Sequence, residues 1–118
     1  MDFRYWPKFL PIVGALALGA VLIPVARADD DVKTVKLTIK DHKLTPERIE
    51  LPSGSKAELT VTNEGPGTEE FESAALRIEK LIPMGKSITV KIGPLRSGTY
   101  DLIGDFHADT CKGTLVVP

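Results

Sequence analysis

The stretch GTYDLIGDFHADTCKGTLVV, residues 98–117, contains two predicted strands joined by a short loop. In its first half Tyr100 and Leu102 alternate with polar residues, and this period of two is typical of a half-buried strand. The loop carries His107, one of only two histidines, and Cys111, the only cysteine. Because both side chains are common metal ligands, the loop raises the question of whether it binds a metal ion.

The same alternation recurs through most of the chain after residue 31. Turn-forming residues such as Pro-Ser-Gly and Asn-Glu-Gly-Pro-Gly separate the alternating segments. The segments with this pattern are VKTVKLTIK (32–40), ERIELPSG (47–54), KAELTVTNEGPG (56–67) and SITVKIGPL (87–95), and LRIEKLIP (76–83) is a candidate for one more. Short strands with frequent turns predict an all-β domain, a Greek-key antiparallel β-sandwich or barrel of about seven strands.

The N-terminal residues have the order of a secretory signal peptide. Arg4 and Lys8 precede an apolar run over residues 9–25, and Ala26-Arg27-Ala28 supplies a small-residue cleavage site. We therefore expect a signal peptide over 1–28, a single domain over 29–118 and a periplasmic protein without a membrane span after cleavage. A retained membrane anchor is the alternative, because the apolar run is at the lower limit of what crosses a bilayer.

The composition after cleavage excludes several classes of function. Removal of residues 1–28 leaves 12 basic and 15 acidic side chains, so no basic stripe for nucleic acid is expected. A lone cysteine forms no internal disulfide. No segment resembles a nucleophile with its base, a phosphate-binding glycine loop or a zinc finger.

Several segments together resemble a known family. LTPERIELPSGSKAELTVTNEG, TEEFES and the closing GTYDLIGDFHADTCKGTLVV are similar to the cupredoxin fold, and to the small periplasmic cupredoxin-like proteins associated with high-affinity iron permeases. The resemblance covers residues 35–117. It implies an iron or copper ion as cofactor, and a membrane iron permease and other periplasmic iron-uptake proteins as partners. It also implies a role in oxidising or handing over ferrous iron, so whether the protein is an enzyme stays open.

The sequence departs from the blue-copper members of that fold at the ligand positions. Those proteins use two histidines, a cysteine and a weak axial methionine. By the resemblance, Glu69 stands where the first histidine would be, and Gly104 stands where the cysteine would end its strand. His107 is retained, and Cys111 takes the place of the methionine unless a one-residue shift puts Thr110 there.

The candidate metal ligands are therefore His107, Asp105, Glu69, His42 and Cys111. Asp105 would face the same side as His107 if the preceding strand continued through both. His42, between the first two strands, would approach His107 across the end of the sandwich. Carboxylates with imidazoles favour iron, manganese or oxidised copper. For Cys111 the alternative is a small buried thiol.

Two other interpretations stay open. The acidic residues Glu69, Glu70 and Glu72 are explained equally well as solvated surface. The alternative to metal binding is that the whole domain is a metal-free module that docks on a permease or another exported partner. Conventional blue-copper electron transfer ranks third, with Cys111 as the sulfur donor.

Overall fold

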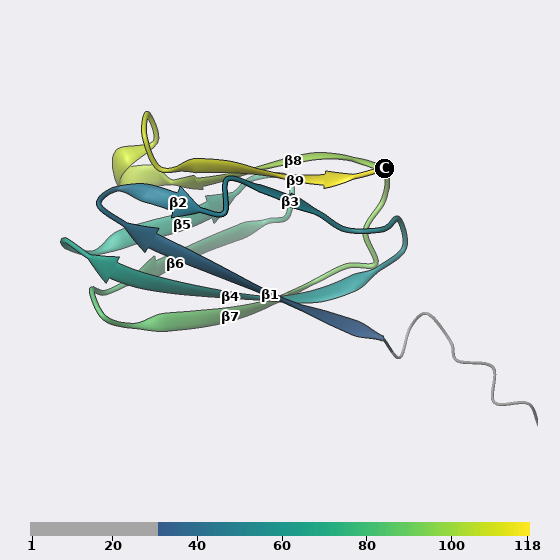
Figure 1. Ribbon diagram of the computed structural model, residues 1–118, viewed down its shortest axis with the longest axis horizontal. Coiled ribbons are helices and arrows are strands. Elements are labelled where there is room, and N and C mark those ends of the chain that lie inside the picture. The colour runs from purple at the N-terminus through teal and green to yellow at the C-terminus, as the bar shows by residue number, and fades with distance from the viewer. Residues whose placement is uncertain (1–30) are drawn as a thin grey trace, which may run out of the picture.

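The protein is described by a computed structural model over residues 31–118. Two β-sheets lie face to face, and the hydrophobic core fills the space between them (Figure 1). The predicted signal peptide, residues 1–28, lies outside the described residues. Among the described residues, no helix has the length and apolarity needed to cross a bilayer.

Among residues 31–118, nine strands form the two sheets. The four-stranded sheet has the order β2 (Lys43–Thr45), β1 (Val32–Lys40), β4 (Lys56–Gly65), β7 (Ser87–Ile92). The five-stranded sheet has the order β3 (Arg48–Glu50), β9 (Lys112–Val117), β8 (Gly98–Gly104), β5 (Glu69–Ser73), β6 (Ile78–Ile82). One single-turn helix, η2 (Asp105–His107), follows β8.

The all-β sandwich is confirmed, and the structure refines its strand number and directions. β1 pairs with β4 in parallel and β3 pairs with β9 in parallel, whereas the other pairs are antiparallel. The chain leaves β1 through β2 and crosses to the other sheet at β3 before it returns as β4, so β1 and β4 run the same way. β3 lies within the alternating segment 47–54, as predicted, whereas β2, with three residues, is too short to show alternation in the sequence.

Alternation places the apolar side chains in the core as predicted. In β4 every second residue is buried, and Phe71 of β5, Leu102 of β8 and Leu115 of β9 are fully buried. Burial of one such side chain stabilises the fold by roughly 1.5–3 kcal/mol. Phe106 departs from the pattern: continued alternation after Leu102 would turn it inward, but it is 51% exposed because β8 stops at Gly104.

One end of the sandwich collects the connections that matter for function. β1 and β4 both finish there, and η2 lies at the same end, at the upper left of Figure 1. Backbone hydrogen bonds tie the loops together: Asp41 donates to the Gly65 carbonyl at 2.9 Å and Gly85 donates to the Asn63 carbonyl at 2.6 Å. We call this end, residues 41–42, 65–69, 83–86 and 105–111, the loop end.

Candidate metal centre

Glu69 is a buried carboxylate whose oxygens are held by three hydrogen bonds. It is the first residue of β5, and its position in the alternation of that strand turns it inward, where it is 2% exposed. Oε1 accepts the backbone N–H of Phe106 at 2.8 Å and that of Glu70 at 3.1 Å. Oε2 lies 2.6 Å from His107 Nδ1. These contacts satisfy a group that would otherwise be costly to bury.

His107 is positioned by the single turn of helix that follows β8. Its carbonyl accepts the N–H of Cys111 at 2.7 Å and the N–H of Thr110 at 3.1 Å, which closes the loop behind it. Its side chain is 34% exposed, so one side of the ring faces Glu69 and another reaches the surface. The His107 ring is thus held by η2 and the loop that follows it, and part of the ring remains exposed to solvent.

His42 reaches His107 from a tight hairpin turn, as expected from the sequence. Asp41 and His42 link β1 to β2 with φ values of 51° and 60°, the positive values that a type I′ turn requires. The two imidazole rings stack with their centroids 3.5 Å apart and an angle of 7° between their planes. Because glycine and asparagine suit such turns best, a histidine in this position carries a conformational cost.

Gly104 leaves the space in which Cys111 and Glu69 meet. A Cβ at residue 104 would lie 2.6 Å from Cys111 Sγ and 2.8 Å from Glu69 Cδ. The strand end therefore has room for the thiol and the carboxylate only because residue 104 has no side chain. The Cys111 sulfur occupies the space into which a side chain at residue 104 would project.

The Cys111 thiol is fully buried, and its environment disfavours the thiolate. Its pKa is raised to about 11, first by burial and then by the negative charge of Glu69, while a backbone hydrogen bond from Gly104 opposes the shift. At neutral pH the side chain is a protonated thiol packed in the core, which is a common use of a free cysteine. The thiolate that a copper ion would bind forms only if the ion displaces this proton.

Asp105 lies apart from the histidines, contrary to the expected shared face. β8 ends at Gly104 and the chain turns into η2, so the strand alternation that would pair Asp105 with His107 is interrupted. Ligand atoms of Asp105, Glu70 and Glu72 all lie within 4.8 Å of one another. Among residues 31–118 this is the one trio of histidine, cysteine or acidic side chains with that property. We call it the outer acidic cluster.

The carboxylates of the outer acidic cluster repel one another. Partial removal from water raises the pKa of Glu70, and the hydrogen bond and charge of Glu79 raise it further. Partial removal from water also raises the pKa of Glu72, followed by the charges of Asp105 and Glu79. Acidic groups in mutual contact on the surface are common in proteins without a metal ion, so this cluster alone does not define a site.

The donors at the loop end fit an open imidazole site better than a closed blue-copper centre. A blue-copper centre needs a thiolate and two imidazoles around one ion. Here the thiol is protonated and buried, and no trio that includes His42, His107 or Cys111 has its donor atoms within 4.8 Å among the described residues. By contrast, Nε2 of His107 and both nitrogens of His42 make no hydrogen bond to the described part of the chain.

Asn63 is a structural residue of the loop end that the sequence analysis did not single out. It is 1% exposed, and its Nδ2 donates to the carbonyls of Gly67 and Ile82, each at 2.8 Å. Its Oδ1 accepts the N–H of Gly65 at 2.8 Å. Asn63 thereby fixes the loop that leads to Glu69. Its position just before the Gly-Pro-Gly turn was the signal available in the sequence.

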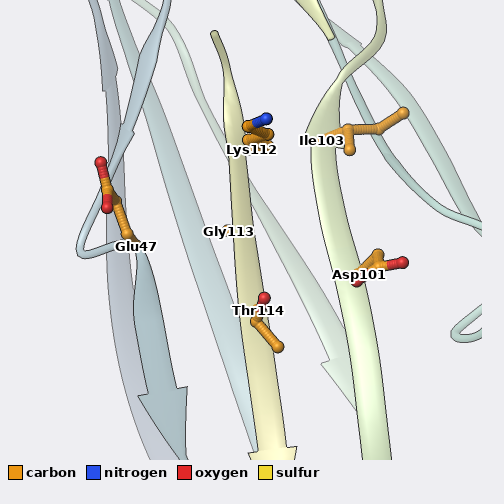
Figure 2. Close-up of a pocket in the computed structure, with 6 residues that line it drawn as sticks. All are labelled: Glu47, Asp101, Ile103, Lys112, Gly113 and Thr114. Carbon is orange, nitrogen blue, oxygen red and sulfur yellow. The ribbon is translucent and has the colours of Figure 1, made fainter. Parts of the chain in front are cut away.

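A hollow elsewhere on the surface does not include the candidate ligands. It lies over β8 and β9 and is lined by Glu47, Asp101, Ile103, Lys112, Gly113 and Thr114, as Figure 2 shows. The loop before β3 lies close against β9 here: Thr114 donates its N–H to the Glu47 carbonyl at 2.8 Å. A Cβ at Gly113 would lie 2.9 Å from that carbonyl oxygen, so glycine permits the close approach.

Comparison with known proteins agrees with this architecture. The sequence profile of the cupredoxin-like domain matches residues 12–117. The chain is 41% identical over 123 residues to an uncharacterized protein of Rickettsia prowazekii (strain Madrid E), RP394, with 99% of this chain and 98% of that protein covered.

Solved structures show the same fold at low sequence identity. Auracyanin A, a "blue" copper protein of Chloroflexus aurantiacus, aligns with a TM-score of 0.64 and 13% identity over 75% of this chain and all of that one. The metal-binding domain of the Cu(I)-exporting ATPase CopA of Streptococcus pneumoniae D39 aligns with a TM-score of 0.64 and 16% identity, over 76% of this chain and 89% of that domain. With a family profile that matches most of its length, this chain belongs to the family of cupredoxin-like domains.

Proposed function

We propose that the protein is a periplasmic metal-binding protein that holds an iron or copper ion at the loop end through His107 and His42. Glu69 contacts the Nδ1 side of His107, Cys111 is buried next to Glu69, and Asp105 belongs to the outer acidic cluster. By its resemblance to proteins associated with iron permeases, it would take up an ion after export and hand it over for uptake. An iron or copper ion bound there would supply a positive charge and a one-electron redox couple.

The single observation that carries this proposal is the pair of histidines that the fold brings into contact at the loop end. Because the stacked rings direct their nitrogen lone pairs into parallel planes, His42 must turn out of the stack for both imidazoles to hold one ion. The two residues are 65 positions apart in the chain, yet the fold brings their rings to 3.5 Å. His42 does so from a left-handed turn position that is unfavourable for a side chain with a Cβ, and His107 does so from a ring anchored by a buried carboxylate. A histidine held in a left-handed turn, next to Asp41 in the same conformation, supports a functional use of this turn.

The family supports a metal site without identifying the ion. Auracyanin A is a copper protein and the CopA domain holds Cu(I), but these proteins share only 13% and 16% identity with this chain. Imidazole nitrogens bind both iron and copper, and nearby carboxylates favour the higher oxidation states. Oxidation of bound ferrous iron would pass one electron per ion to a separate one-electron acceptor. Binding and hand-over of the ion need no such acceptor, and they are the function proposed.

Calorimetric titration with ferrous iron under anaerobic conditions, and separately with cupric ion, tests the proposal. We compare the wild type with His107→Ala and His42→Asn, and expect each substitution to weaken binding at least tenfold because each removes one imidazole donor. Asparagine suits a left-handed turn position, so His42→Asn removes the ligand while keeping the turn.

Asp105→Asn is the matched control for the histidine variants. It removes one carboxylate of the outer acidic cluster and leaves both imidazoles in place. If binding stays at the wild-type level in Asp105→Asn and falls in the histidine variants, the loop-end site is supported. If all four proteins bind equally, or only Asp105→Asn binds weakly, the proposal is wrong.

A metal-free docking module is the second candidate, and two exposed apolar side chains favour it. Met84 is 60% exposed and Phe106 is 51% exposed, and both belong to the loop end. A complex between the purified protein and an iron permease that persists in chelator, and that is weakened by Phe106→Ala but not by His42→Asn, would support docking without metal. Loss of that complex on chelation would contradict it.

A further inference from the structure

The hydrogen bonds of Glu69 distinguish between two roles, that of a metal ligand and that of a residue that positions His107. As a ligand, Glu69 would direct a free oxygen lone pair toward the ion. In the structure Oε1 already accepts two backbone N–H groups and Oε2 is 2.6 Å from His107 Nδ1. The side chain of Glu69 is 3% exposed, whereas that of His107 is 34% exposed. The histidine therefore lies between the carboxylate and solvent.

The chemistry of the two groups determines which nitrogen carries the proton. An ionised carboxylate only accepts hydrogen bonds, so the nitrogen facing it must be the donor. In neutral His107 this is Nδ1–H, and Nε2 then keeps the lone pair. The backbone N–H groups of Phe106 and Glu70 also donate to this carboxylate, so it acts as an acceptor toward both of these neighbours.

We infer that Glu69 is a positioning residue for His107, and that Nε2 of His107 is the atom through which this imidazole binds metal. This inference rests on the proposed function of the loop end. A carboxylate behind a ligating histidine fixes the ring orientation and raises the basicity of the ligating nitrogen. Because the Cys111 sulfur is fully buried in the space beside Gly104, the accessible donors are imidazole nitrogens, which suit iron, oxidised copper or zinc more than reduced copper.

Nuclear magnetic resonance of the metal-free protein tests the role of Glu69 without any metal. Long-range correlations between ring protons and ring nitrogens in the 15N-labelled protein report the tautomer of His107. We expect Nδ1 to be protonated and Nε2 to be bare. The opposite tautomer, with Nε2 protonated, would mean that Glu69 donates to Nδ1, and it would overturn the inference whether or not the protein binds metal.

Zn²⁺ serves as the diamagnetic probe for the ligating atom. On titration with Zn²⁺ we expect the Nε2 resonance of His107 to shift by far more than that of Nδ1, while the proton on Nδ1 remains. Loss of that proton would place the ion on the Glu69 side of the ring and contradict the inference. Absence of any Zn²⁺, ferrous or cupric binding would contradict the proposed function and leave the tautomer result standing.

The variant Glu69→Gln, with Glu70→Gln as its control, tests positioning by function. The amide keeps the size of the side chain and can donate to Nδ1, so we expect His107 to switch to the Nε2–H tautomer. Zn²⁺ affinity should fall about 10- to 100-fold, the usual effect of losing a partner behind a ligand. Glu70→Gln should change neither tautomer nor affinity. An unchanged tautomer and affinity in a folded Glu69→Gln protein would contradict the inference.

Discussion

Glu69 and Glu70 are neighbours in the sequence with opposite environments. Glu69 faces the inside of the sandwich, where two backbone donors and an imidazole hold it. Glu70 faces outward, where Glu72 and Asp105 lie within 4.8 Å of it. The same chemical group is thus held in place on one face of β5 and repelled on the other. Acidic residues that are adjacent in a strand point to opposite faces of the sheet, so the face on which each one lies decides whether it can contribute to a candidate site.

The largest expected difference between these two carboxylates is in stability. Glu69→Ala leaves the buried N–H of Phe106 and the ring of His107 without their acceptor, and we expect a loss of about 3 kcal/mol in the free energy of unfolding. Denaturant unfolding measures it.

The control for this prediction is Glu70→Ala, which should change stability little because the side chain is at the surface. Glu69→Gln provides a milder second variant, because an amide oxygen in the place of Oε1 still accepts the N–H groups of Phe106 and Glu70. An equal effect of Glu69→Ala and Glu70→Ala would remove the distinction between the two faces of β5.

Gly104→Ala tests how closely the inner groups are packed. The added Cβ would lie 2.6 Å from Cys111 Sγ and 2.8 Å from Glu69 Cδ, so we expect a loss of about 1–3 kcal/mol from overpacking. Cys111→Ala removes the sulfur, and in that background Gly104→Ala should be less harmful. A double-mutant cycle from denaturant unfolding measures the coupling, and strict additivity of the two substitutions would contradict the contact.

The pKa of the Cys111 thiol predicts a fall in stability at high pH. The ordinary value is 9.0 and the folded protein raises it to about 11, so the folded state retains a proton that the unfolded state releases. The contribution is complete below pH 9.0 and is lost as the pH rises to about 11. We expect a fall of about 2 kcal/mol.

Unfolding of the wild type and of Cys111→Ala across that pH range measures this effect. The substitution removes the titrating group, so the difference between the two proteins isolates the thiol from the lysines and tyrosines that titrate nearby. If the two stability curves stay parallel, the thiol is not held in its protonated form by the fold.

The smallest effect is expected in the outer acidic cluster. Partial removal from water and repulsion raise the pKa values of Glu70 and Glu72 in the folded protein, so the folded state holds their protons more tightly. Their contribution to stability therefore falls as the pH rises through and above their ordinary range. Glu72→Gln should flatten this fall slightly in melting curves between about pH 4 and about pH 7. A steeper fall in the variant would contradict mutual repulsion.

Local pattern was sufficient for most of the fold because strands with one buried face alternate visibly. The strands expected from their residues are β1, β3, β4, β7, β8 and β9, and the segment proposed as an additional strand is β6. β5 was not counted among them because its glutamates mask the alternation around Phe71. Its inward residues are fixed by pairing with β6 and β8, which no local pattern encodes.

The candidate site was predictable in part. The sequence identified His107, Glu69 and His42, and the fold brings these three to the loop end. Their roles as metal ligands stay predictions, as do the roles of Asp105 and Cys111. The resemblance placed the end of this strand at Gly104, but strand alternation alone did not reveal it. The turn that follows depends on hydrogen bonds from Thr110 and Cys111 to the His107 carbonyl, which no alternation encodes.

The sequence by itself determined the alternating strands, the residues of the core and the presence of two imidazoles and one thiol in the loops. Tertiary structure alone decided which of these groups meet. Strand alternation is a property of neighbours and is encoded locally, whereas the approach of His42 to His107 depends on the packing of two sheets and on a left-handed turn. The division between Glu69 and Glu70 has the same origin, because only the closed sandwich gives a strand an inside and an outside.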